Sequence, residues 1–416
     1  MFYSAFEILK QGLTGNKGWK PVWRDPAPKP EYDVIIIGGG GHGLATAHYL
    51  AKTYGITNVA VLERGYLGGG NIGRNTTIVR CDYGQPGNSE FYSHSMKLWE
   101  GLSQDLNYNV MHSQRGMLQL CHSDEQVASY RKRANMINAR GDEAQIIDRD
   151  TIRKRAPYID LDNARFPVRG GLWQKRGGTA RHDAVAWGYA RSADSRGVDL
   201  IQNCAVTGFD ITDGRVTGVQ TTRGAIKAKK IGMAVAGRSS EVGAMAGLRL
   251  PIESHVLQAF VTEGIKPFID YTISFGMGHF YINQSDKGGL VFGGDLDMYN
   301  SYAQRGNLPR VEQVAEAGMA MIPAIGKARQ LRSWGGIMDM SMDGSPFIDK
   351  THIDGLFFNG GWCYGGFKAA PASGAAFAHL IATGQHASFA AKFRLDRYKT
   401  GHLIDEGGHG ASPKLH

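Results

Sequence analysis

The residues with the clearest chemical meaning form the motif Gly38-x-Gly40-x-x-Gly43. A segment rich in β-branched residues, 32–37, precedes it, and a segment with helical character, 44–52, follows it. In such a strand–turn–helix unit the first glycine allows the tight turn, the second lets the backbone approach a pyrophosphate, and the third lets the helix pack against the strand. The motif therefore predicts a dinucleotide site at the helix N-terminus, with contacts from Gly38, Gly40, Gly41, His42 and Gly43.

An acidic residue ends the next expected strand, 58–63. Glu63 at this place can hold ribose hydroxyls and disfavours a 2′-phosphate, so FAD or NAD is expected rather than NADP. A glycine-rich loop, 65–70, follows the acid at once, which is typical of FAD enzymes. The further cofactor contacts expected from this region are Arg64, Gly70, Asn71, Arg74, Asn75, Thr76 and Thr77.

Two later motifs also suit a flavin nucleotide. The segment 229–240 ends a strand in Ala-x-Ala-Gly and resembles the second dinucleotide-contact motif of FAD oxidoreductases. Its candidate contacts are Ala236 and Gly237, with Val206 on a preceding strand as a backbone contact to adenine. Near the C-terminus, glycines at a helix N-terminus can stabilise negative charge on a reduced ring. The candidates there are Gly365, Gly366, Phe367 and Lys368.

Two cations are candidates for a direct role with a substrate. Arg80 lies just beyond Ile78 on an expected strand, where it either points at the substrate or lies at the surface. Lys368 follows the last glycines, where it either binds a carboxylate or is an ordinary solvated lysine. The residue pattern alone leaves these alternatives open.

The elements that must position these residues form an α/β chain. With 416 residues and 42% hydrophobic composition, the chain can bury the core of one two-layered unit or of two linked domains. Helices are expected at 91–102, 124–139 and 183–196, within a mainly helical region 85–145, and strands at 198–203, 205–209, 215–222, 225–234 and 289–293. The dinucleotide pattern starts early, is interrupted, and returns late. This predicts a Rossmann-like FAD-binding domain of the glutathione-reductase type, interleaved with an antiparallel-sheet α+β substrate domain.

The predicted boundaries follow from this interleaving. Residues 1–30 are an N-terminal arm, and residues 401–416 are a C-terminal tail. The FAD-binding domain is assigned 31–100, 175–250 and 335–400, and the substrate domain is assigned 101–174 and 251–334.

Charge and cysteine content exclude several other classes of protein. The net charge of +9 raises the possibility that the protein binds nucleic acid. The basic residues are scattered, however, with their densest groups at 131–133 and 227–230. A solvated surface, an anionic cofactor or an acidic partner subunit is therefore expected instead. The four cysteines form no CxxC pair. We therefore expect no zinc site and no disulfide framework, which fits a cytoplasmic setting. Neither a membrane span nor a secretory signal is expected.

Nearly the whole chain, from Trp19 to the segment 401–406, resembles the β subunit of heterotetrameric sarcosine oxidase, within the wider D-amino-acid-oxidase-like group. The matching stretches are long and specific. They are 32–51, 55–63, 68–80, 97–109, 113–116, 177–188, 198–203 and 365–368.

The resemblance implies two flavins and a multisubunit assembly. A noncovalent FAD would occupy the dinucleotide site, and an FMN would be joined covalently to His182, with Arg181 beside it, and would face the substrate domain. Such a link is chemically reasonable, because a neutral imidazole nitrogen can attack the activated 8α-methyl group of a flavin. The implied partners are an α subunit that binds NAD and tetrahydrofolate, and two small subunits.

The resemblance also implies the reaction. Arg80 and Lys368 match the positions that bind the carboxylate of an N-methyl amino acid in this family. Hydride would pass to FAD and electrons to FMN, where oxygen is reduced to hydrogen peroxide. The imine would yield formaldehyde, or its one-carbon unit would go to tetrahydrofolate. The expected substrate is sarcosine, which becomes glycine.

Two segments beside the expected substrate site depart from the family pattern. After Arg80 the chain reads Cys81-Asp82-Tyr83-Gly84-Gln85, where Ser-Asn-Tyr-Leu-Trp is usual, and it has Cys363-Tyr364 where Gly-Thr is typical. One bulky side chain can change substrate choice about 10- to 200-fold. Asp82 is in addition a possible partner for a cationic substrate group.

These departures leave other functions open. One is a dehydrogenase for N-methylglutamate or another secondary amine that uses an acceptor other than oxygen. Another is a single-chain FAD amino-acid dehydrogenase without FMN. The third is a flavin-bearing scaffold that serves assembly and has lost turnover.

Overall fold

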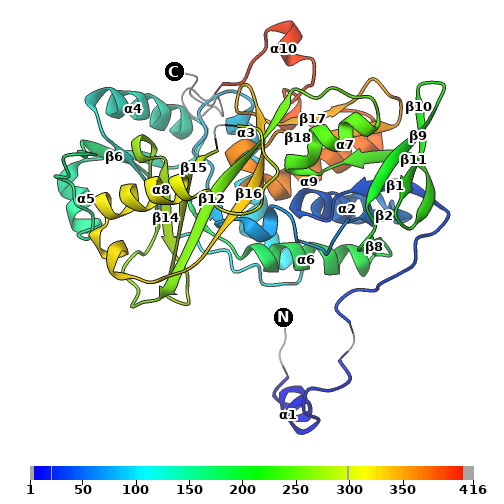
Figure 1. The fold of residues 1–416 in the computed structure, drawn as a ribbon, viewed down its shortest axis with the longest axis horizontal. Helices are drawn as coiled ribbons and strands as arrows, with labels where there is room; N and C mark the ends of the chain where they lie inside the picture. The colour runs from blue at the N-terminus through cyan, green and yellow to red at the C-terminus, as the bar shows by residue number, and fades with distance from the viewer. Residues whose placement is uncertain (1–3, 20, 298, 406–416) are drawn as a thin grey trace.

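The computed structural model describes residues 4–19, 21–297 and 299–405, and within these ranges two eight-stranded sheets form the frame of the molecule (Figure 1). The strands of the first sheet are β1 (Glu31–Ile37), β2 (Val59–Leu62), β8 (Asp199–Ile201), β9 (Val206–Thr212), β10 (Arg215–Thr221), β11 (Gly224–Met233), β17 (Phe347–Lys350) and β18 (Leu356–Gly360). Their order is β17-β18-β11-β1-β2-β8, and the β9–β10 hairpin extends from β11. Strands β18, β11, β1, β2 and β8 run parallel, as a Rossmann-like domain requires.

Both faces of this sheet are covered, and β1 shows why. Val34 and Ile36 face one hydrophobic cluster, while Ile35 and Ile37 face another. A strand buried on both faces reads as a continuous apolar run, which is the pattern of 34–37. The helices that pack on the first cluster are α2 (Gly41–Tyr54), α3 (Asn88–Asp105), α6 (His182–Asp194) and α9 (Gly366–Thr383).

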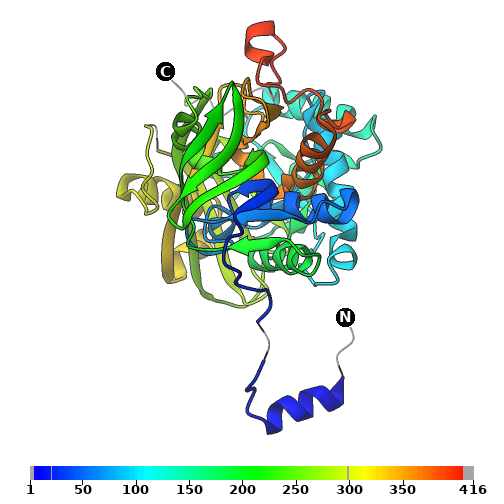
Figure 2. The same ribbon diagram turned by 90° about the vertical axis from the view of Figure 1, so that its right-hand side faces the viewer.

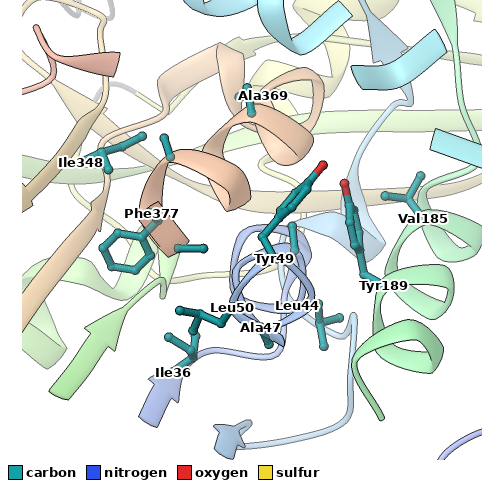
Figure 3. Packing of buried hydrophobic residues seen from close by; sticks show 14 of the residues in the cluster. Ile36, Leu44, Ala47, Tyr49, Leu50, Val185, Tyr189, Ile348, Ala369 and Phe377 are labelled. Atoms are coloured by element: carbon teal, nitrogen blue, oxygen red, sulfur yellow. The ribbon is translucent and has the colours of Figure 1, made fainter. Parts of the chain in front are cut away.

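Helix α2 lies at the centre of this layer. Figure 3 shows Leu44 and Leu50 of α2 among side chains from β1, α6 and α9, including Tyr189 and Phe377. Helices α2 and α9 approach closely, because a Cβ at Gly374 would lie 2.4 Å from the Cβ of Ala45. The two helices that begin at the glycine motifs therefore pack directly against each other.

The second sheet lies beside the first and carries the substrate side. Its strands are β4 (Met117–Cys121), β5 (Ala144–Ile147), β6 (Gly170–Gln174), β12 (Ile252–Gly264), β13 (Thr272–Phe275), β14 (Phe280–Gln284), β15 (Gly289–Leu296) and β16 (Gln330–Ser341). Their order is β16-β12-β15-β14-β13-β4-β6-β5. All pairs are antiparallel except β13–β4, the parallel pair that joins strands from distant parts of the chain.

The remaining elements cover these sheets, connect them or, for α1, lie in the N-terminal arm. They are α1 (Ala5–Leu13), η1 (Ile72–Arg74), β3 (Ile78–Val79), α4 (Asp124–Asn138), α5 (Arg149–Arg155), β7 (Gly178–Thr179), η2 (Ala236–Arg238), α7 (Ser239–Met245), η3 (Gly276–Gly278), α8 (Leu308–Met321), η4 (Pro323–Lys327), η5 (Cys363–Gly365), η6 (Ser388–Ala390) and α10 (Arg397–Thr400). In the described part of the chain, no helix is both long and apolar enough to cross a membrane.

The fold confirms the predicted class and most of the predicted elements, with one correction. Helices α3, α4 and α6 and strands β8 to β11 and β15 lie where they were predicted, within a few residues at their ends. The prediction of a mainly helical region 85–145 missed β4 and the start of β5. Every residue of β4 is buried, so its sequence lacks the alternation that reveals a strand. Strand β16 also crosses the predicted domain boundary at 335.

The N-terminal arm stands away from the body, with α1 at its far end (Figure 2). Arg24 anchors the arm, because its Nε donates to Asp194 at the end of α6 (2.8 Å) and its Nη2 donates to the Val198 carbonyl (2.8 Å). Lys29 pairs with Asp199 at 2.7 Å. No residue of α1 is buried.

Candidate functional site

The first glycine motif forms a cradle where β1 meets α2. Gly38 has a φ of 111°, and a Cβ there would lie 2.4 Å from the Ala234 carbonyl oxygen. A Cβ at Gly43 would lie 1.9 Å from the carbonyl oxygen of Gly38, whereas a Cβ at Gly40 would meet nothing within 4 Å. The first and third glycines are thus required by chain packing, and the second leaves the backbone open. No side chain caps α2, so its first amides are available to a pyrophosphate.

Glu63 lies at the mouth of this cradle. Its carboxylate accepts hydrogen bonds from the amides of Gly39 and Gly65, both at 2.9 Å. The Cys204 amide donates to the Glu63 carbonyl (2.8 Å), and two residues later Val206 begins β9. The structure therefore brings Glu63 and Val206 to one edge of the sheet, and their contacts with a ribose and its base stay a prediction. Arg64 is exposed beside them.

The loop after Glu63 is fixed by its own polar side chains. The Asn71 amide bonds the backbone of Ile337 in both directions, with the Ile337 amide donating at 3.1 Å. Arg74 donates to the carbonyls of Gly69 and Gly70, and Asn75 accepts from the Thr77 amide at 2.6 Å. The Thr76 carbonyl accepts from Asn283 of β14 at 2.9 Å. These residues shape the path of the loop, and their contacts with a cofactor stay a prediction.

The second dinucleotide motif meets the first at the end of β11. The Ala234 amide donates to the Ile37 carbonyl (2.9 Å), directly before the cradle. Ala236 has a φ of 47°, and a Cβ at Gly237 would lie 2.3 Å from the Ile337 carbonyl oxygen. Strand β16 is therefore packed against Gly237 and, through Ile337, is bonded to Asn71 in the loop after Glu63.

Three residues that sequence reasoning missed support the cradle, and they are Trp362, Ser373 and Asp339. The His42 ring stacks on Trp362 at 4.7 Å between centroids, and its Nδ1 hydrogen-bonds the Ser373 hydroxyl at 2.6 Å. Burial lowers the pKa of His42 to about 4, so the ring is neutral near pH 7. Asp339 accepts from the amides of Gly361 (2.7 Å) and Trp362 (3.0 Å), and burial raises its pKa to about 6. No sequence signal marks these residues, because their partners are distant in the chain.

Lys368 lies buried in the first turn of α9. Its side chain donates to the Tyr364 carbonyl at 2.6 Å, and the residue is only 6% exposed. Burial and then the positive charge of Arg80 hold its pKa well below the ordinary value of a lysine. The positive end of the α9 helix dipole also disfavours the charged form of the lysine. The solvated-lysine alternative is therefore wrong, and the site is one that an anion would stabilise.

Arg80 is largely covered as well, with a side chain 11% exposed. Its Nη1 lies 2.5 Å from Asp82, and its guanidinium lies 4.6 Å from the centre of the Tyr83 ring. Burial acts to lower its pKa, but the Asp82 carboxylate outweighs this and holds the pKa above the usual value. The surface-arginine alternative is therefore also wrong. Asp82 has an internal partner, which argues against its predicted role as partner of a cationic substrate group.

The last glycine motif packs tightly against aromatic rings. Tyr83 stacks on Tyr92 at 3.7 Å, and a Cβ at Gly365 would lie 1.9 Å from the Tyr92 hydroxyl. Phe367 packs on Trp99 at 5.4 Å. Gly366 begins α9 next to the His42 ring. The motif thus connects the cradle with the two buried cations.

His182 begins α6 beside the segment that carries Arg80. Strand β7 pairs with β3, and the Ala180 amide donates to the Thr77 carbonyl at 3.0 Å. The Nδ1 of His182 is buried and has no hydrogen-bond partner among the described residues. Burial lowers its pKa, which favours the neutral ring. The neighbouring Arg181 is exposed and makes two bonds to Asp183, at 2.9 and 2.8 Å.

Comparison with known proteins agrees with this arrangement. The family model described as FAD dependent oxidoreductase (DAO) matches residues 33–380. Sarcosine oxidase subunit beta of Rhizobium meliloti (strain 1021) is 67% identical over 416 residues, 100% of both chains, and the protein of that name from an Arthrobacter species is 47% identical over 95% of this chain and 97% of its own. The structure of L-proline dehydrogenase from P. horikoshii has a TM-score of 0.84 at 27% identity and covers 90% of this chain and 100% of its own. The chain therefore belongs to the FAD-dependent oxidoreductase family and, within it, to the family of sarcosine oxidase β subunits.

Proposed function

We propose that this chain is the β subunit of a sarcosine oxidase and carries out the oxidative demethylation of sarcosine to glycine. The observation that carries the proposal is the pair of buried cations, Arg80 and Lys368, beside the dinucleotide cradle. It occurs in a chain 67% identical, over its full length, to a protein named sarcosine oxidase subunit beta.

The two cations suit the carboxylate of an amino acid. A carboxylate between them would relieve the repulsion that lowers the pKa of Lys368 and would also meet the positive end of α9. Charge-assisted contacts of this kind contribute about 1.5–3 kcal/mol each. Bound FAD would accept hydride from the N-methyl carbon, and the chain's own residues would orient that carbon. No protein base is required if the neutral amine binds.

His182 is the proposed attachment point of a covalent FMN. Its buried Nδ1 has no hydrogen-bond partner among the described residues, and burial lowers the pKa of the ring; both fit a nitrogen that forms a bond to a flavin. Arg181 and Arg332 bring positive charge close to the ring, since both act to lower its pKa. The same positive charge suits the phosphate of FMN.

The proposed partners are a large α subunit that binds NAD and tetrahydrofolate, and two small subunits, in the cytoplasm. The buried, unpaired cysteines agree with a reducing compartment. Helix α1 supports assembly, because Phe6, Leu9 and Leu13 are 59–80% exposed on one apolar side. Its polar side carries Glu7, Lys10 and Gln11, without the excess of cations that membrane-surface helices have. A protein partner therefore fits α1 better than a lipid surface.

A substrate panel tests the proposed reaction. The protein, co-expressed with its partner subunits, is mixed anaerobically with sarcosine, N-methylglutamate, dimethylglycine and glycine, and flavin absorbance is followed. Sarcosine is expected to bleach the flavin fastest, because the buried cations can bind its one carboxylate. Faster bleaching by N-methylglutamate would favour the related dehydrogenase. Failure of every N-methyl amine would contradict the proposed function.

The apolar side of α1 is expected to be required for assembly. Replacing Phe6 and Leu9 together with serine removes two exposed apolar contacts and is expected to abolish co-purification of the α subunit in size-exclusion chromatography. The FAD content should stay unchanged, because α1 has no buried residue. The matched control replaces Lys10 and Gln11 on the polar side with serine. Unchanged assembly of the Phe6 and Leu9 variant would contradict this role.

A further inference from the structure

We infer that Asp82 is a positioning residue, whose carboxylate holds the Arg80 guanidinium in the orientation in which it meets the substrate carboxylate. The inference rests on the proposed function for the role of Arg80. It concerns a position at which this chain departs from the Asn that is usual in the family it resembles.

Asp82 is itself held from three directions. It is 1% exposed, and one carboxylate oxygen contacts the Arg80 Nη1 at 2.5 Å. The other oxygen accepts from the Gln119 amide of β4. Its backbone carbonyl accepts from the Arg133 Nε of α4 at 2.6 Å. The second sheet and its helix therefore fix the carboxylate before any substrate binds.

Arg80 is confined on a second side by aromatic rings. Its guanidinium lies over Tyr83, and Tyr83 stacks on Tyr92 at 3.7 Å. The absence of a side chain at Gly365 lets the Tyr92 hydroxyl come close to the start of α9. A guanidinium has five N–H donors in a fixed plane. With Asp82 on one edge and Tyr83 on one face, the remaining donors have a set direction.

The negative charge of Asp82 also reaches the second cation. Burial and Arg80 lower the pKa of Lys368, and Asp82 opposes them by raising it. Asp82 therefore acts on both groups proposed to bind the carboxylate. It orients Arg80 by direct contact, whereas its effect on the pKa of Lys368 is smaller than the effects of burial and of Arg80.

Two substitutions separate orientation from charge. Asp82→Ala removes the contact with Arg80 and is expected to raise the KM for sarcosine about 10-fold or more, with kcat within about threefold. Asp82→Asn keeps an acceptor for Arg80. The Oε1 of Gln119 is buried and unpartnered among the described residues, so a turn of that amide lets it accept from the new Asn. Asp82→Asn is therefore expected to restore KM to within about threefold of wild type.

A third variant keeps the charge and loosens its orientation. Gln119→Leu removes the second support of Asp82 and is expected to raise KM several-fold, which also keeps the inference testable if Asp82→Ala does not fold. The matched control is Asp194→Ala, which removes the partner of Arg24 far from the site. This control should leave KM unchanged.

Binding of acetate makes the test independent of turnover. Acetate titration, followed by the flavin absorbance, should give a Kd about 10-fold weaker in Asp82→Ala and near wild type in Asp82→Asn. If wild type binds acetate but sarcosine does not reduce its flavin, the proposed function fails. The acetate affinities of the variants still decide the inference about Asp82 in that case. Equal acetate affinity in wild type and Asp82→Ala would overturn the inference. Acetate binding to Asp82→Asn as weak as acetate binding to Asp82→Ala would overturn the inference as well.

Discussion

Replacing Lys368 with methionine is expected to raise the KM for sarcosine about 10- to 150-fold, which is the loss of one charge-assisted contact. Methionine keeps the length and apolar stem of the lysine, so α9 can keep its packing. Steady-state kinetics with sarcosine provides the measurement. The control is Lys350→Met, which alters an exposed lysine at the end of β17.

The same lysine is expected to set an alkaline limit on substrate binding. Lys368 binds the carboxylate only while its ammonium is protonated, so kcat/KM should fall as pH rises through its pKa. Burial and the charge of Arg80 lower that pKa, so the fall should come below the range of an ordinary lysine. The pH profile of Lys368→Met should lack this limb. A limb that persists in the variant would assign the titration to the substrate amine or another group.

Replacing His182 with alanine is expected to remove the covalent flavin completely. After acid precipitation the wild-type pellet should stay yellow, and the variant pellet should be colourless, because only a covalent bond survives denaturation. FAD should still be released into the supernatant of both proteins, since the cradle of α2 does not involve His182. Absorbance of pellet and supernatant measures both outcomes.

The matched control for this experiment is His112→Ala. His112 also has a buried nitrogen without a hydrogen-bond partner among the described residues, and burial lowers its pKa as it does that of His182. Its loss should leave the pellet yellow. A colourless wild-type pellet would remove the case for a flavin on His182, and a yellow pellet from His182→Ala would place the bond on another residue.

Local signals in the sequence were enough to predict the class of the fold and the position of the glycine cradle. The spacing of Gly38, Gly40 and Gly43 between a strand and a helix predicts a dinucleotide site. In the structure chain packing requires glycine at 38 and 43, while Gly40 leaves the backbone uncovered. Glu63 directly follows Leu62, the last residue of β2, within one residue of the expected strand end, because strand length and the following glycines mark the turn. Strand β4 escaped prediction, since burial on both faces removes the alternation that identifies a strand.

The burial and the electrostatic environment of Arg80 and Lys368 could be established only from the tertiary structure. The sequence left Arg80 and Lys368 each with a surface alternative, because exposure depends on which distant segments cover a residue. In the structure both side chains are largely covered, and they lie close enough for the charge of Arg80 to lower the pKa of Lys368. It also pairs Asp82 with Arg80 and Gln119, a contact between a loop and a strand of the second sheet.

The sequence by itself determined the dinucleotide motif, the class of the fold and the family, because these depend on residues that act locally or on long stretches of identity. Only the tertiary structure decided that water is largely excluded from Arg80 and Lys368 and that the Asp82 carboxylate already contacts Arg80. It also decided that a nitrogen of His182 has no hydrogen-bond partner within the described part of the chain. The physical reason is that burial and electrostatic interaction depend on distances in space, and those distances are set by α9, β4 and the β3–β7 pair acting together.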